Sequence, residues 1–174
     1  MIKILFICHG NICRSTMAEQ VMKHMVAQRG IAHDFFIDSA ATSTEEIGNP
    51  IYPPAARKLR SEGIPVGSHR SRQLRKADYD KFDLLLCADS ANIRNSLRIL
   101  GSDDEGKLRR LLEYTPRPRD IADPWYTGNF DETYEDVREG CEALLAELWP
   151  VNRDESAPIT YNERDTQPQE VISP

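Results

Sequence analysis

The feature that most constrains this chain is a buried-strand pattern that runs directly into a short segment rich in reactive side chains. Residues 2–7 are apolar at nearly every position, which is typical of a strand buried on both faces of a parallel sheet. The next eight residues, Cys8 to Ser15, read CHGNICRS, and apolar side chains at helical spacing follow them. This segment therefore joins a strand to a helix, either as an ordinary tight connection or as a cradle for an anion with a nucleophile at its centre.

Strand and helix patterns alternate along the rest of the chain. Helical spacing from Ser15 to about Gly30 predicts the first helix, capped by Ser15 or Thr16. The run 108–112 is short enough to be a fourth strand or a helix. The alternation predicts an α/β three-layer sandwich, in which a small parallel sheet of about four strands has helices on both faces and a phosphate loop after the first strand. The other predicted elements are strands at 35–37 and 83–87 and helices at 55–61, 90–100 and 131–148.

Length and composition indicate one globular domain over residues 1–150 and a polar tail over residues 151–174, which we expect to be disordered. The apolar fraction of 40% and the charged fraction of 29% are those of a soluble protein. No apolar stretch approaches the ~20 residues that cross a bilayer, and the N-terminal run is too short for a signal peptide. The four cysteines form no dense disulfide framework. We therefore expect a cytoplasmic protein without a membrane partner.

The charge distribution argues against one class of partner. A net charge of −6 disfavours general nucleic-acid binding. The stretch 57–81 nevertheless holds eight basic and three acidic side chains, a local net charge of +5. Such a stretch is either a solvated face or a docking surface for an acidic partner, and the sequence leaves both open.

The residue types in Cys8–Ser15 suit an anion site with a nucleophile. Ligand sites in parallel α/β sheets form beyond the carboxyl ends of the strands, and a helix N-terminus there favours anions. Gly10 and Asn11 allow the backbone to turn so that its amides converge. Arg14 adds a planar fork that takes two oxygens at once. The same positive field favours the thiolate form of Cys8, to which Ser15 can donate a hydrogen bond.

With these residues in place, the chain resembles a known family. Cys8 to Ser15 is similar to the phosphate loop, C-x5-R-S, of the low molecular weight protein tyrosine phosphatases. The resemblance covers about residues 1–149 and leaves the tail outside it. It implies hydrolysis of phosphotyrosine in proteins, and of small aryl phosphates, with no metal or cofactor. The further matching motifs are DSAATS (38–43), IGNP (47–50), GIP (63–65), SH (68–69), CAD (87–89) and DPWY (123–126).

The resemblance also implies roles for individual residues. Cys8 is the nucleophile that becomes a phosphocysteine, Arg14 binds the phosphoryl group, and Asp123 is the general acid and then the base. On the residues alone, Asp123 followed by proline is also a common turn signal. The phosphate-binding loop residues implied by the resemblance are His9, Gly10, Asn11, Ile12, Cys13 and Ser15.

Residues around the loop receive supporting roles by the same resemblance. Ser39 and His69 are expected to hold the loop by hydrogen bonds, although His69 is also consistent with a surface histidine. Trp125 and Tyr126 are expected to wall the substrate cleft, and half-buried core aromatics are the alternative. Asp89 lies near the expected edge of the site, and an N-cap of the helix at 90–100 is at least as good an interpretation.

The remaining cysteines divide into two kinds. The resemblance implies that Cys13 traps the oxidised nucleophile as a reversible disulfide, which the chemistry of sulfenic acids permits. Cys87 and Cys141 fall in a strand and on the apolar face of a helix, which predicts core positions.

Three rival functions follow from the same pattern. An arsenate reductase of this fold needs further cysteines near the third strand, where Cys87 stands alone. A protein-arginine phosphatase carries threonine at the position of Ile12, whose larger side chain favours phosphotyrosine. A phosphopeptide-binding module without turnover has no need of Cys8, Arg14 and Asp123 together.

The sequence departs from the family pattern in two places. The segment Thr44–Glu46 lacks an aromatic residue that many members place on the cleft wall, and Thr16 replaces a frequent proline. The expected partners are phosphotyrosine-containing proteins. A tyrosine kinase acting at Tyr126 or Tyr161 is an alternative that the sequence leaves open, because most exposed tyrosines are not phosphorylated. We expect a monomer.

Overall fold

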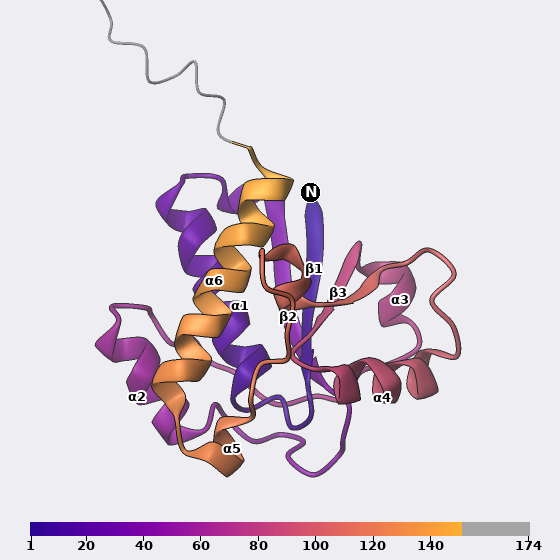
Figure 1. Ribbon diagram of the computed structural model, residues 1–174, viewed down its shortest axis with the longest axis horizontal. Coiled ribbons are helices and arrows are strands. Elements are labelled where there is room, and N and C mark those ends of the chain that lie inside the picture. Colours follow the sequence, from indigo (N-terminus) through magenta and orange to yellow (C-terminus); the bar gives the residue numbers. More distant parts are fainter. Residues whose placement is uncertain (151–174) are drawn as a thin grey trace, which may run out of the picture.

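The computed structural model of the 174-residue chain describes residues 1–150 (Figure 1). Four strands form one parallel sheet in the order β2-β1-β3-β4. This confirms the predicted α/β fold with a four-stranded parallel sheet, and the predicted tail lies outside the described residues. The strands are β1 (Ile2–Cys8), β2 (Phe35–Ala41), β3 (Leu84–Cys87) and β4 (Leu108–Arg110).

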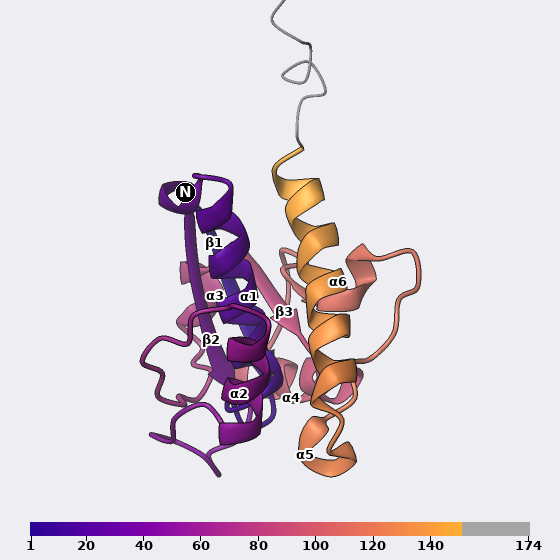
Figure 2. The same ribbon diagram turned by 90° about the vertical axis from the view of Figure 1, so that its left-hand side faces the viewer.

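Helices cover both faces of the sheet, as Figures 1 and 2 show. The longest two, α1 and α6, pack against each other on one face together with α2, and α3 and α4 lie on the other face. The short α5 comes directly before α6 in the chain. The helices are α1 (Arg14–Gln28), α2 (Pro53–Ser61), α3 (Asp78–Lys81), α4 (Ser90–Leu100), α5 (Pro124–Thr127) and α6 (Phe130–Leu148), with 3-10 turns at Ala32–Asp34 and Leu111–Tyr114.

The N-terminal apolar run is explained by a core on each side of β1. Ile4 and Phe6 belong to the cluster under α1 and α6, whereas Leu5 and Ile7 belong to the cluster on the α4 side. Successive side chains of a strand point to opposite faces, so both faces of β1 must be apolar. Close packing also fixes α6, because a Cβ on Gly140 would lie 2.5 Å from the Leu111 side chain.

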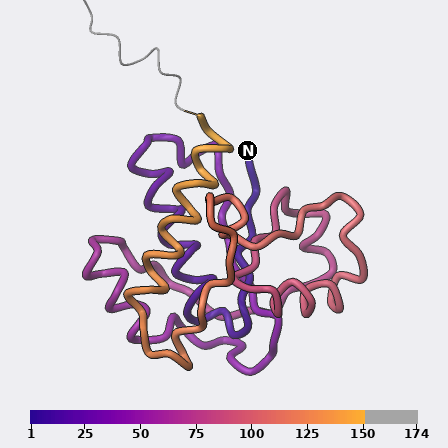
Figure 3. Tube along the Cα trace, in the orientation of Figure 1, coloured from indigo at the N-terminus to yellow at the C-terminus, as the bar shows by residue number. Residues whose placement is uncertain are grey.

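The strand direction decides where a site can form. All four strands are parallel, so their carboxyl ends lie at the same edge of the sheet. In the tube of Figure 3, the indigo segment of β1 runs downward from the labelled N-terminus. β1 ends there at Cys8, which is paired with Ala41 at the end of β2. Among the described residues, no helix has the length and apolar composition that a bilayer span requires.

Several boundaries differ from the sequence predictions. α1 begins at Arg14 and has no side-chain cap, so the predicted cap by Ser15 or Thr16 is wrong; Thr16 Oγ1 donates instead to the Cys13 carbonyl at 2.8 Å. β2 continues to Ala41 because the residues after Ile37 are also paired with β1. The run 108–112 is divided between β4 and a 3-10 turn. The short helices α3 and α5 were not predicted.

Candidate active site

The phosphate loop, Cys8–Ser15, curls around the Cys8 sulfur between β1 and α1. Asn11 has φ +57°, a left-handed conformation that asparagine adopts more readily than most residues. This turn brings the Asn11 N–H to 3.3 Å from Cys8 Sγ, and Ser15 Oγ lies 3.0 Å from the same sulfur. The thiol at the end of β1 therefore has a backbone donor and a hydroxyl beside it, at the N-terminus of α1.

Asn11 holds the shape of the phosphate loop from within. Its side chain is fully buried, and its amide nitrogen donates to Ser15 Oγ at 2.9 Å and to Ser39 Oγ at 2.8 Å. Its side-chain oxygen accepts from the Arg72 backbone N–H at 3.2 Å. Each hydrogen-bonding group of this buried amide therefore has a partner, which a stable buried polar group requires.

A second layer of side chains holds the back of the phosphate loop. Ser39 Oγ donates to the Glu19 carboxylate, and Glu19 is itself buried in α1. His69 Nε2 donates to the Asn11 carbonyl at 2.7 Å, and Ser71 Oγ donates to the Gly10 carbonyl at 2.8 Å. Ser39 and His69 thus lie where the sequence resemblance placed them, and the His69 side chain is only 7% exposed. Sequence reasoning missed Glu19 and Ser71.

Arg14 is buried and held from three sides. One guanidinium nitrogen donates to the Asp89 carboxylate and to the Ile121 carbonyl at 3.0 Å, and the other donates to Asp123 Oδ2 at 3.2 Å. Burial lowers the pKa of Arg14, but the charges of Cys8 and Asp123 and the bond to Asp89 outweigh that effect and raise it. The guanidinium therefore stays charged beside the Cys8 sulfur.

Asp89 fulfils both interpretations that the sequence allowed. It caps α4, because Asp89 Oδ1 accepts from the Asn92 N–H at 2.7 Å while Asn92 Oδ1 accepts from the Asp89 N–H at 3.2 Å. Its other oxygen accepts from Arg14. The helix cap and the arginine partner are thus the same carboxylate.

The acid loop, residues 120–123, carries Asp123 to the phosphate loop. The Ile121 N–H donates to the Ala88 carbonyl at 2.9 Å, and Asp120 accepts from the Ser90 N–H at 3.0 Å. Asp123 then caps α5 by accepting from the Trp125 N–H at 3.1 Å while its other oxygen faces Arg14. Backbone contacts with the ends of β3 and α4 therefore fix the position of this carboxyl group.

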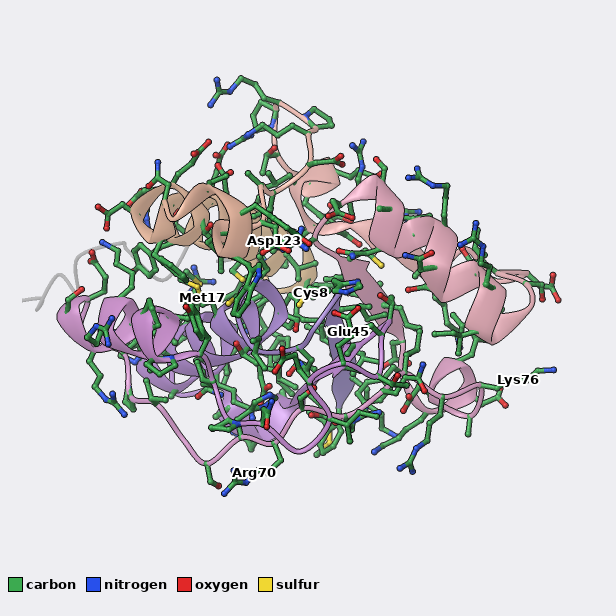
Figure 4. All side chains as sticks on the ribbon, turned by 90° about the horizontal axis from the view of Figure 1, so that it is seen from below. Cys8, Met17, Glu45, Arg70, Lys76 and Asp123 are labelled. Carbon is green, nitrogen blue, oxygen red and sulfur yellow. The ribbon has the colours of Figure 1, made fainter. Side chains whose placement is uncertain are left out.

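A pocket with a volume of about 100 Å³ opens above the Cys8 sulfur. Viewed from below in Figure 4, Asp123 and Glu45 lie on opposite sides of Cys8. Trp125 and Tyr126 are 53% and 82% exposed and line this pocket, so the alternative of half-buried core aromatics is wrong. The full lining is Cys8, His9, Gly10, Ile12, Cys13, Arg14, Glu45, Glu46, Asp123, Trp125 and Tyr126.

The other three cysteines differ in their access to this pocket. Cys13 is buried but lines it; burial, followed by the charge of Cys8, raises the pKa of the Cys13 thiol. Cys87 and Cys141 are fully buried core residues. Burial raises the pKa of the Cys87 thiol to about 12 and also raises the pKa of the Cys141 thiol.

The redox role of Cys13 stays a prediction. Within residues 1–150, no group of His, Cys, Asp and Glu side chains is arranged to hold a metal ion.

No residue of the basic stretch 57–81 lines the pocket, although its His69 and Ser71 contact the back of the phosphate loop. Figure 4 shows Arg70 and Lys76 at the periphery of the face that has Cys8 at its centre. Arg72 is bound to Asp38 and Asp78 at 3.0 Å each. Part of the stretch is therefore neutralised within the fold, and docking of an acidic partner stays a prediction.

The family model for low molecular weight phosphotyrosine protein phosphatases matches residues 3–154. The chain belongs to this family. It is 38% identical over 150 residues to the low molecular weight protein-tyrosine-phosphatase YfkJ of Bacillus subtilis, spanning 85% of this chain and 96% of the relative. It is 37% identical over 147 residues to the human low molecular weight phosphotyrosine protein phosphatase, spanning 82% of this chain and 92% of the relative.

Solved structures with names of phosphatases or of their relatives superpose on the chain. The crystal structure of Bacillus subtilis YfkJ has a TM-score of 0.82 at 36% identity and covers 90% of this chain and 98% of its own. A Drosophila arginine phosphatase has a TM-score of 0.79 at 28% identity and covers 87% of this chain and all of its own. The structural neighbours therefore include one named as an arginine phosphatase, so the fold alone does not decide the substrate and the pocket must.

Proposed function

We propose that this chain is a phosphotyrosine-protein phosphatase that works through a phosphocysteine intermediate. The observation that carries the proposal is the convergence of the Cys8 sulfur, the Arg14 guanidinium and the Asp123 carboxyl group on one pocket. These three side chains come from the end of β1, the start of α1 and the acid loop. Cleavage of a phosphate ester by covalent catalysis needs a nucleophile, a positively charged group held in place and a proton donor.

In the first displacement, the Cys8 thiolate attacks the phosphorus of phosphotyrosine. A sulfur–phosphorus bond forms, and the bond from phosphorus to the phenolic oxygen breaks. The Asp123 carboxyl group gives its proton to that oxygen, so tyrosine leaves as a neutral phenol. The loop amides and Arg14 stabilise the negative charge that spreads over the other phosphoryl oxygens.

In the second displacement, water releases the phosphate. The Asp123 carboxylate accepts a proton from the water as its oxygen attacks phosphorus, and the sulfur–phosphorus bond breaks. Ser15 Oγ, 3.0 Å from Cys8 Sγ, donates a hydrogen bond to the departing thiolate. The products are inorganic phosphate and the starting enzyme, and no metal takes part in either step.

The rival reactions have weaker support. An arsenate reductase relays electrons through further thiols, but Cys87 is fully buried on β3 beside Ser96 Oγ and does not line the pocket. For a protein-arginine phosphatase, the relevant position is Ile12, which lines the pocket with an apolar side chain. An aromatic ring between Ile12 and the exposed Trp125 gains apolar contacts that a guanidinium does not need.

The experiment compares three proteins on three substrates in the presence of EDTA. Wild type hydrolyses p-nitrophenyl phosphate and a phosphotyrosine peptide far faster than a phosphoarginine peptide. Cys8→Ser abolishes this turnover, and Asp123→Ala slows it strongly. An inactive wild type, or activity that survives in Cys8→Ser, contradicts the proposal and supports a binding module instead. A preference for phosphoarginine supports the arginine phosphatase.

We also propose the cellular setting that this function implies. The partners are phosphotyrosine-containing proteins and a tyrosine kinase acting on Tyr126, which is 82% exposed; Tyr161 lies outside the described residues. A monomer in the cytoplasm suits an enzyme whose pocket is complete within one chain. Sedimentation of the full chain and fractionation of cells test these two points.

A further inference from the structure

Two glutamates stand on the pocket wall across from the acid loop. Glu45 and Glu46 line the same pocket as Cys8, and Figure 4 shows Glu45 on the side of Cys8 away from Asp123. The Glu45 side chain is 69% exposed. These two residues, which we call the acidic wall, therefore face whatever part of a substrate extends from the pocket on that side.

Backbone hydrogen bonds attach the segment just before the acidic wall to the phosphate loop. The Thr42 N–H donates to the Cys8 carbonyl at 2.9 Å, and the Ser43 N–H donates to the His9 carbonyl at 3.0 Å. Asn49 Nδ2 donates to Glu46 Oε2 at 2.6 Å. Glu46 also packs over the loop, since a Cβ on Gly10 would lie 3.4 Å from its Cγ. The two carboxylates are thus held beside the phosphate site.

The charges at this mouth are unevenly divided. Arg14 is 3% exposed and faces the bottom of the pocket, where it serves the phosphoryl group. At the rim, His9 is the basic side chain that lines the pocket, and its Nε2 lies 3.0 Å from Glu45 Oε2. The flanks of a bound peptide therefore meet a surface in which carboxylates predominate.

We propose that the acidic wall selects phosphotyrosine substrates with a lysine or arginine next to the phosphotyrosine. The proposal rests on the phosphatase function proposed above. A basic flanking side chain pairs with Glu45 or Glu46, whereas an acidic one is repelled. Pairs of exposed charges change affinity by only about 1.5- to 5-fold each, and salt weakens them, so the selection is moderate and additive.

The test uses three phosphotyrosine peptides that differ only in basic, neutral or acidic flanking residues. We expect kcat/KM to fall in that order for wild type, with a ratio of basic to acidic peptide that decreases at high salt. Glu45→Gln and Glu46→Gln each lower the ratio about 1.5- to 5-fold, and the double variant lowers it further. Glu147→Gln removes an exposed charge at the far end of α6 and leaves the ratio unchanged.

Further measurements separate this inference from the phosphatase function. Hydrolysis of p-nitrophenyl phosphate, which has no flanking residue, reports the chemistry, and calorimetric binding of the three peptides to Cys8→Ser reports recognition without turnover. Turnover with equal kcat/KM for the three peptides, or an unchanged ratio in the double variant, overturns the inference. Selective binding without any turnover in wild type supports the acidic wall and overturns the phosphatase function.

Discussion

Most polar side chains of the phosphate loop are buried and hydrogen-bonded, whereas the aromatic side chains of the pocket rim are exposed. In the loop, Asn11, Arg14 and Ser15 are at most 3% exposed, and each side chain has hydrogen-bond partners. At the rim, Trp125 and Tyr126 are largely exposed. Buried hydrogen bonds are costly to break, whereas exposed side chains change at little cost in stability. Changes in the loop should therefore affect rate and stability, and changes at the rim should affect substrate affinity and choice.

The largest effect is expected from Asp123→Asn, a change where the two regions meet. With a phosphotyrosine peptide, kcat falls by about 10²- to 10⁴-fold because proton donation to the leaving group is lost. The loss is smaller with p-nitrophenyl phosphate, whose phenolate leaves without much help. Asparagine still caps α5 through its oxygen, so the fold is retained. Steady-state kinetics on both substrates check this, and equal losses would show that Asp123 is not the acid.

Arg14→Lys tests whether the loop requires a planar fork or only a charge. We expect kcat to fall about 10²- to 10³-fold, the typical effect of removing one transition-state donor. A lysine cannot contact Asp89, the Ile121 carbonyl and two phosphoryl oxygens together. Circular dichroism verifies that the variant folds. A decrease smaller than tenfold contradicts the role assigned to the fork.

Ser39→Ala tests the support behind the loop. The free energy of unfolding should fall by about 1–3 kcal/mol, because Asn11 and the buried Glu19 carboxylate each lose a partner. Ser61→Ala is the control, since Ser61 is an exposed serine of α2 and should cost less than about 0.5 kcal/mol. Urea denaturation measures both. A similar decrease in the free energy of unfolding for the two variants would contradict the role of Ser39 in supporting the phosphate loop.

Tyr126→Ala tests the rim and should have the smallest effect on stability. Because the side chain is 82% exposed, the free energy of unfolding changes by less than about 0.5 kcal/mol. The KM for a phosphotyrosine peptide rises about two- to tenfold, as expected for a lost aromatic contact, while kcat is retained. A variant that loses kcat with unchanged KM would place Tyr126 in the chemistry instead.

The sequence predicted correctly those elements that depend on the pattern of apolar residues at neighbouring positions. The β1 strand, its loop and α1 follow from one continuous run of residues, because burial on both faces of β1 requires apolar side chains at nearly every position. The fold and the family were confirmed. Asp123 was placed only by family resemblance, since the residue it contacts, Arg14, is 109 positions away in the chain.

The residues that sequence missed depend on contacts between distant segments. Nothing in the local sequence marks Glu19 as buried, but in the fold it is buried in α1, where Ser39 on β2 donates a hydrogen bond to its carboxylate. Two roles were expected for Ser15, a cap of α1 and a hydrogen bond to Cys8, and only the second is present, since its hydroxyl lies beside the Cys8 sulfur and the Asn11 amide. Contacts within the folded phosphate loop therefore take the serine hydroxyl away from the helix N-cap position that local sequence favours.

The central claim is that the phosphoryl group passes through Cys8, and rapid quenching tests it most directly. Asp123→Asn, in which the attack of water on the phosphocysteine is slowed, is mixed with p-nitrophenyl phosphate, whose leaving group needs little proton donation, denatured within the first turnover and digested for mass spectrometry. Phosphorylation should be found on the peptide that contains Cys8, and Cys8→Ser should show none. Turnover without any phosphorylated cysteine, or phosphorylation at another residue, would contradict the account.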